Sequence, residues 1–159
     1  MNFDQAFQVL LQREGRFSNH PADKGGQTMW GITEAVARAH GYVGAMEELT
    51  QWQAGAIYRA SYWTPLKADQ LPAEVRFDVF DGAVNSGVVQ SAKWLQRALG
   101  VTDDGVVGPQ TLAAAQRAPA AVLKCQYNGQ RLAFMTDLAA WPMFGKGWAR
   151  RVAKNLMEV

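Results

Sequence analysis

The chain has 159 residues, of which 48% are hydrophobic and 19% are charged, so the composition is that of a globular protein and excludes disordered and collagen-like classes. The single cysteine, Cys125, excludes an intrachain disulfide and a cysteine-based zinc site, and its apolar neighbours predict a buried thiol. The net charge of +2 is mild, but basic residues gather late, at Lys146, Arg150, Arg151 and Lys154. They could attract an anionic polymer or simply form a solvated helix face.

The first residues do not have the pattern of a secretory signal peptide, which is a basic segment followed by an unbroken apolar run. No later stretch approaches the roughly 20 apolar residues that span a membrane. We therefore expect a protein that is made in the cytoplasm and does not insert stably into a membrane.

The N-terminal segment has the spacing of an amphipathic helix, with Asn2 as its N-cap and Gly15 at its end. Its apolar stripe consists of Phe3, Ala6, Phe7, Leu10 and Leu11. Residues 16–31 then combine one proline and three glycines with polar residues. This composition predicts a loop or a degenerate hairpin.

A second helix begins after Thr50, because the sequence Thr-Gln-Trp-Gln at 50–53 is a capping box, and helical spacing continues to Pro65. Glycine and proline signals delimit further helices at residues 72–87, 88–99, 110–117, 120–138 and 148–157. No strand pattern exceeds a few residues. The sequence therefore predicts a mainly α protein.

Glu14 continues the apolar stripe of the first helix, so it lies on the face that is predicted to be buried. Partial burial raises the pKa of a carboxyl group, and the negative end of the helix dipole acts in the same direction. Both effects suit a general acid that works near neutral pH. The alternative is an ion pair with Arg13 or Arg16.

Asp23 follows Glu14 by nine positions, and Thr28 follows Asp23 by five. Glycoside hydrolysis commonly uses one carboxylic acid to protonate the leaving oxygen and a second carboxylate to attack the sugar or activate a water. Thr28 could hold that water. The residues alone leave open that Asp23 merely closes an Asx turn.

Residues 14–28, EGRFSNHPADKGGQT, followed by WGIT at 30–33, resemble the signature of glycoside hydrolase family 108, the N-acetylmuramidases found among phage endolysins. Residues 57–65 and 77–87 are similar to further segments of this family. The chain departs from the family pattern at His20, where the family often has an acidic residue.

The resemblance implies a lysozyme-like fold and cleavage of the β-1,4 bond between N-acetylmuramic acid and N-acetylglucosamine. It also implies that Glu14 is the catalytic acid, with Asp23 and Thr28 as its partners. The expected protein is thus a peptidoglycan hydrolase that acts on the bacterial cell wall in the periplasm. It would need a holin or another export factor to reach that substrate.

Candidate sugar contacts come from a polar stripe and from aromatic residues. Asp78, Asp81 and Asn85 recur at i, i+3 and i+7 in an otherwise apolar segment, so they either line a cleft or form a solvated edge. Asn85 is the favoured ligand, because its amide both donates and accepts hydrogen bonds. We also expect Asp81 to bind substrate, and Trp30 and Tyr62 to stack on sugar rings.

Residues 95–111 resemble small helical peptidoglycan-binding modules through LQ at 95–96, LG at 99–100, DG at 104–105 and GP at 108–109. The glycines make turns and Pro109 opens a helix, which are structural reasons for the pattern. We expect a muramidase lobe at residues 1–90 and a peptidoglycan-binding-like lobe at residues 91–159, packed as one compact unit.

Two other functions are compatible with this fold. A lytic transglycosylase shares the catalytic glutamic acid but needs no second carboxylate, so Asp23 argues against it. A non-catalytic wall-binding or scaffold protein is the other alternative. The sequence contains no metal or nucleotide motif, so we expect no metal, no cofactor and no nucleic-acid partner.

Overall fold

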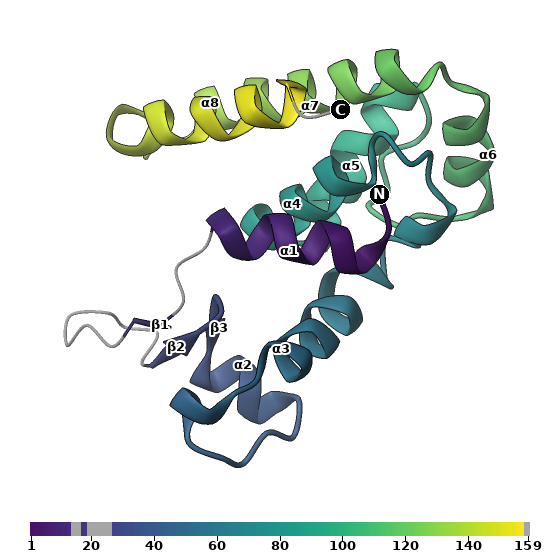
Figure 1. Ribbon diagram of the computed structural model, residues 1–159. Coiled ribbons are helices and arrows are strands. Elements are labelled where there is room, and N and C mark those ends of the chain that lie inside the picture. Colours follow the sequence, from purple (N-terminus) through teal and green to yellow (C-terminus); the bar gives the residue numbers. More distant parts are fainter. Residues whose placement is uncertain (14–16, 19–26, 158–159) are drawn as a thin grey trace. The chain divides into compact units, whose positions relative to one another are not determined.

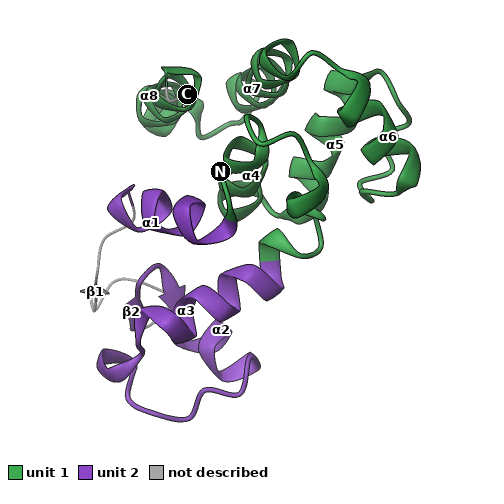
Figure 2. Ribbon diagram, turned by 45° about the vertical axis from the view of Figure 1, so that its right-hand side comes forward, with its two compact units in different colours: residues 1–2, 62–159 green, residues 3–61 purple. Residues whose placement is uncertain are grey.

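The computed structural model describes residues 1–13, 17–18 and 27–157 (Figure 1). The chain forms two compact units (Figure 2), residues 3–61, which we call the N-terminal unit, and residues 1–2 with 62–159, which we call the C-terminal unit. The units do not follow the expected boundary at residue 90, because residues 76–99 pack against the later helices. The division into a muramidase lobe and a binding lobe stays a prediction.

The N-terminal unit combines short helices with a small antiparallel sheet of order β1-β2-β3. Its elements are α1 (Phe3–Arg13), β1 (Phe17–Ser18), β2 (Thr28–Met29), β3 (Ile32–Thr33), α2 (Glu34–Ala39), the 3₁₀ turn η1 (Met46–Glu48) and α3 (Gln51–Tyr58). The strands confirm a hairpin within residues 16–31, and residues 19–26 lie outside the described part of the chain.

The two local predictions for the N-terminal unit are confirmed. Four members of the predicted stripe, Phe3, Ala6, Phe7 and Leu10, are buried along one face of α1, and the fifth, Leu11, is partly buried. Thr50 caps α3 by accepting a hydrogen bond from the backbone N–H of Gln53, and the Gln53 side chain completes the capping box. The buried face of α1 and the start of α3 are thus both determined by residues that are close in the sequence.

The C-terminal unit consists of helices and loops, and its described residues contain no strand. The π-helical segment η2 (Arg59–Trp63) continues α3 into it, and its further elements are η3 (Ala68–Gln70), α4 (Arg76–Ser86), α5 (Val88–Leu99), α6 (Pro109–Arg117), α7 (Ala120–Thr136) and α8 (Trp141–Met157). Helix α7 packs against α4, α5 and α8. Trp94 lies at the centre of this core, edge-on to Tyr127 and Phe134. The predicted mainly α architecture is confirmed.

Helix α8 begins seven residues before its predicted start at residue 148, at Trp141. Pro142 lies in its first turn, where a backbone N–H has no intrahelical partner and a proline is tolerated. Gly145 is packed beneath the Trp141 ring, where an added Cβ would come within 2.5 Å of the indole. The glycine is therefore required by packing and does not end the helix.

Cys125 is exposed, so the predicted buried thiol is wrong. The buried face of α7 contains Leu123, Tyr127 and Arg131. Because successive residues of a helix are rotated by 100°, Cys125 lies on the opposite side from Leu123 and Tyr127. Apolar neighbours in sequence do not indicate burial when they belong to another helix face.

In the described part of the chain, no helix has both the length and the apolar character that crossing a membrane requires.

Candidate functional site

The predicted catalytic residues are only partly covered by the structure. Glu14 and Asp23 lie outside the described residues. Thr28 lies in β2, partly buried, with Ser18 and Thr33 as its cross-strand partners. Because β2 pairs with β1 on one side and with β3 on the other, the Thr28 backbone is held from both sides, which restricts the position of its hydroxyl.

Trp30 belongs to the two-residue turn between β2 and β3. Trp30 and Gly31 both have positive φ angles, 55° and 76°, as in the type I′ turns that match the twist of a hairpin. The Trp30 indole N–H donates to the carbonyl of Leu49 at 2.7 Å, and its own carbonyl accepts from the Tyr58 hydroxyl at 3.1 Å. One hydrogen bond thus orients the partly buried indole and the other holds the Trp30 backbone. The stacking of Trp30 on sugar stays a prediction.

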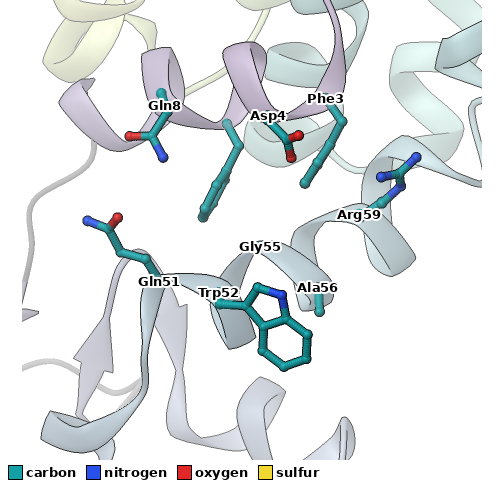
Figure 3. Close-up of a pocket in the computed structure, with 9 residues that line it drawn as sticks. Phe3, Asp4, Gln8, Gln51, Trp52, Gly55, Ala56 and Arg59 are labelled. Atoms are coloured by element: carbon teal, nitrogen blue, oxygen red, sulfur yellow. The ribbon is translucent and has the colours of Figure 1, made fainter.

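An open groove of about 550 Å³ lies between α1 and α3 within the N-terminal unit (Figure 3). Phe3, Phe7 and Gly55 form its apolar lining. Polar side chains lie along its sides: Gln8 and Gln51 at one end and Arg59 at the other, with Asp4 on α1 between them.

The groove offers the groups that bind saccharides: an indole, side-chain amides and charged groups. The Trp52 side chain at its edge is 82% exposed. Sequence reasoning missed this groove. The available signal was Trp52, a large aromatic residue on the outward face of a helix whose other face buries Ala54, Ile57 and Tyr58.

Asp81, a predicted sugar contact, is fully buried in the C-terminal unit. One carboxylate oxygen accepts from Arg131 at 2.7 Å and from Asn155 at 3.2 Å, and the other accepts from two nitrogens of Arg151, at 2.6 and 2.9 Å. Burial opposes its charge, but the guanidinium groups of Arg131 and Arg151 outweigh burial and hold the pKa of Asp81 below its usual value. A carboxylate enclosed in this way has no face open to a sugar, so we reassign Asp81 to the core.

Asp78 is also buried, one helical turn before Asp81. Its Oδ1 accepts from the amide of Asn128 at 2.7 Å. Burial raises the pKa of Asp78 to about 6, although the Asn128 hydrogen bond and Lys124 act in the opposite direction. The first two members of the predicted polar stripe are therefore buried, and Asp78 reaches only the floor of a small pocket of about 150 Å³.

The raised pKa of Asp78 predicts that the C-terminal unit loses stability as pH rises from about 4 to about 6. Below pH 3.8 the carboxyl is neutral in the folded and the unfolded chain, whereas above 6 it is charged in both and the folded state bears the cost of burial. With folded and unfolded pKa values of about 6 and 3.8, this cost is about 3 kcal/mol at neutral pH. Asp78→Asn should remove this cost, because the amide carries no charge and its oxygen can still accept from Asn128.

Urea denaturation of the wild type and of Asp78→Asn at pH 4 and pH 7 measures this difference. The two proteins should be similarly stable at pH 4, and the variant should be more stable at pH 7. If the free energy of unfolding changed by the same amount between pH 4 and pH 7 in both proteins, Asp78 would not be the responsible group.

Asn85 and Tyr62 keep the accessibility that a ligand contact needs. The Asn85 side chain is exposed near the end of α4, and its Nδ2 donates to the carbonyl of Asp81 at 2.7 Å, which orients the amide. Tyr62 is partly buried against the core of the C-terminal unit. Their sugar-binding roles stay predictions.

The segment that resembles peptidoglycan-binding modules is held together by the buried side chain of Gln96. Its Nε2 donates to Asp104 at 2.6 Å and to Thr111 at 3.3 Å, and its Oε1 accepts from the backbone N–H of Gly105 at 2.8 Å. Gly105 has φ +80°, and a Cβ there would come within 2.8 Å of Val89. The pattern thus closes the loop between α5 and α6, which accounts for its residue types.

Within residues 1–13, 17–18 and 27–157, no group of three histidine, cysteine, aspartate or glutamate residues is arranged to hold a metal ion.

Comparisons with known proteins give two family matches. The model of Glycosyl hydrolase 108 matches residues 7–87, and the model described as a predicted peptidoglycan domain matches residues 90–153. Among solved structures, the chain is similar to SagA of Brucella abortus, with 36% sequence identity and a TM-score of 0.85. This match covers 98% of the present chain and 91% of that chain. No curated protein matches the sequence.

Proposed function

Because the chain belongs to the glycosyl hydrolase 108 family, we propose that this peptidoglycan hydrolase is an N-acetylmuramidase that uses Glu14 as its general acid. The proposed scissile bond is the β-1,4 bond between N-acetylmuramic acid and N-acetylglucosamine. The observation that carries the proposal is the family match over residues 7–87, the segment that contains Glu14, Asp23 and Thr28.

Glu14 donates a proton to the oxygen of the leaving sugar, and Asp23 activates a water that attacks the anomeric carbon from the opposite face. The hydroxyl of Thr28 helps to hold this water. Two observations support the assignment. The apolar stripe that Glu14 continues is buried from Phe3 to Leu10, and Thr28 is partly buried in the central strand of the sheet.

Asn85, Trp30 and Tyr62 complete the proposed substrate contacts. The oriented amide of Asn85 can both donate to and accept from an acetamido group, and the two aromatic rings can stack on sugars. The peptidoglycan domain matched at residues 90–153 supports the bacterial cell wall as the substrate. Release to the periplasm through a holin or another export factor belongs to the same proposal.

The proposed roles predict unequal effects of two substitutions. Asp23→Asn should abolish most turnover while substrate binding is retained, because an amide cannot take the proton of the attacking water. Thr28→Ala should reduce turnover less, because a hydroxyl only positions that water. Lysis rates and binding of a soluble glycan fragment, with the surface substitution Asp137→Asn as control, separate the two effects. Near-wild-type turnover of Asp23→Asn would make Asp23 a loop residue.

The stereochemistry of the product tests the attacking group directly. Attack by a water held by Asp23 and Thr28 predicts inversion, so the first product from the β-linked substrate is the α anomer. Proton NMR of a soluble oligosaccharide digest, recorded before mutarotation, identifies this anomer. An initial β anomer would contradict the water-holding role and make Asp23 the nucleophile of a covalent intermediate.

A further inference from the structure

The turn between α7 and α8 exposes an unbroken apolar segment. Residues 138–144, LAAWPMF, contain no charged side chain. Met143 is 78% exposed, Phe144 51% and Leu138 36%. Helices α7 and α8 pack against each other (Figure 1), so the segment forms the tip of a helical hairpin, which we call the apolar tip. Contiguous apolar surface of this kind marks an interaction site.

The outer face of α8 continues from the apolar tip as a cationic surface. Lys146, Arg150 and Lys154 are exposed and recur every four residues, so they lie on one side of the helix. Met143 and Met157, which is 72% exposed, lie at the two ends of the same side. The opposite side of α8 buries Gly145, Val152 and Asn155.

The charge of this surface is of one sign. Residues 141–157 contain no aspartate or glutamate. The fourth cation of α8, Arg151, is turned inward and pairs with Asp81 at 2.6 Å, so it does not belong to the outward-facing group. The three outward cations thus present a positive face beside the apolar tip.

Aromatic residues extend the apolar tip along the side of α8 that lies opposite the three cations. The Trp141 and Trp148 rings lie 6.2 Å apart, and Phe144 stacks on Trp148 at 5.9 Å. Amphipathic aromatic rings of this kind are typical of surfaces at the level of lipid headgroups. Trp141, Phe144 and Trp148 share this side because they recur at i, i+3 and i+7, whereas Met143 lies on the side of the cations.

We propose that the apolar tip and the outer face of α8 form a peripheral binding surface for anionic phospholipid membranes. A bilayer accepts both halves of the surface, because apolar side chains enter the acyl boundary while lysines and arginines bind the phosphates. A polysaccharide would satisfy the cations but not the exposed aliphatic side chains of Leu138 and Met143. A second copy of this face would bring like charges together. Binding of this kind holds the protein on a membrane without spanning it.

The test uses the full-length protein and sedimentation with vesicles of phosphatidylglycerol and phosphatidylethanolamine, compared with vesicles of phosphatidylcholine. Two variants separate the halves of the surface: Met143→Ser with Phe144→Ser, and Lys146→Gln with Arg150→Gln and Lys154→Gln. Matched controls are Val122→Ser, an exposed apolar position of α7, and Arg117→Gln, an exposed cation of α6. Circular dichroism verifies that each variant is folded.

The wild type and both controls should bind anionic vesicles more strongly than neutral ones, and more weakly as salt increases. Removal of three cations should weaken binding about a hundredfold. Removal of the two apolar side chains should weaken it by about tenfold or more. Tryptophan emission should shift to the blue on binding in the wild type but not in the apolar-tip variant.

Three results would overturn the proposal. The first is that the wild type does not bind anionic vesicles, and the second is that both variants bind them as strongly as the wild type does. The third is that the variants no longer sediment with purified cell walls while their binding to vesicles is unchanged. The last result would identify the face as a wall-binding surface. A dimer in size exclusion that both variants dissociate would identify it as an interface between copies. Hydrolysis of soluble glycan fragments is measured separately, so failure of the membrane proposal leaves the proposed enzymatic function standing.

Discussion

Glu14→Gln should fold like the wild type and lose about 10² to 10⁴-fold of its hydrolytic activity, because an amide cannot donate the proton that the leaving sugar oxygen requires. Glutamine has nearly the same size and shape as glutamate, so the substitution removes the acid proton with little change in side-chain volume. Clearing of a peptidoglycan suspension measures activity, and thermal unfolding followed by circular dichroism verifies the fold.

The matched control is Glu48→Gln, which makes the same chemical change at an exposed position of the same unit. This variant should keep wild-type activity. A folded Glu14→Gln protein that clears peptidoglycan at a rate close to that of the control would remove Glu14 from the role of general acid.

Asp81→Asn should lower the free energy of unfolding of the C-terminal unit by about 3 to 5 kcal/mol, the cost of leaving buried charges without their partner. The Arg131 side chain is 2% exposed and Arg151 is 19% exposed, so water cannot replace the lost carboxylate charge at Arg131. Urea denaturation, with its midpoint and slope, measures the loss.

Asp103→Asn is the matched control, because Asp103 also pairs with an arginine, Arg97, at 2.6 Å, but both side chains are more than 40% exposed. An exposed pair contributes little to the free energy of unfolding, because water and salt screen its charges. Equal effects of the two substitutions would contradict the structural role of Asp81.

Protonation should act on Asp81 in the same direction as the substitution. Because the folded-state pKa of Asp81 is lowered, its contribution to stability is present above the unfolded-state pKa and is lost as pH falls through the folded-state value. Acid therefore lowers the stability of the C-terminal unit by protonating Asp81. A rise in pH toward 6 also lowers it, because Asp78 then becomes charged in the folded state.

Features that depend on nearby residues were predictable from the sequence. The buried stripe of α1 follows from helical spacing alone, and the start of α3 follows from Thr50 and Gln53, which are three residues apart. The turn-forming composition of residues 16–31 predicted a loop or a degenerate hairpin, and the structure has a short hairpin there.

Features that depend on distant partners were not predictable. The stripe of Asp78, Asp81 and Asn85 was correctly recognised as polar, but its first two carboxylates are buried because Asn128 and Arg131 reach them from α7, 50 residues away. Spacing within a helix shows which residues share a face, but it does not show what covers that face. The same limit explains why the groove beside Trp52 was missed.

The early start of α8 had a different cause. Pro142 lies in the first turn, where a proline is tolerated, and Gly145 packs against the ring of Trp141, four residues earlier in the same helix. The proposed pair of Glu14 and Asp23 rests on the family match over residues 7–87 and on residue chemistry.

The most direct test of the proposed activity is to identify the new chain ends that the purified protein releases from peptidoglycan. Mass spectrometry of the soluble fragments, before and after borohydride reduction, distinguishes reducing sugars from 1,6-anhydro sugars. Hydrolysis of the proposed bond predicts reducing N-acetylmuramic acid ends that are absent from the Glu14→Gln digest. Ends carrying 1,6-anhydro-N-acetylmuramic acid would contradict hydrolysis and identify a lytic transglycosylase, and a folded, wall-bound protein that releases no new ends would contradict catalysis itself.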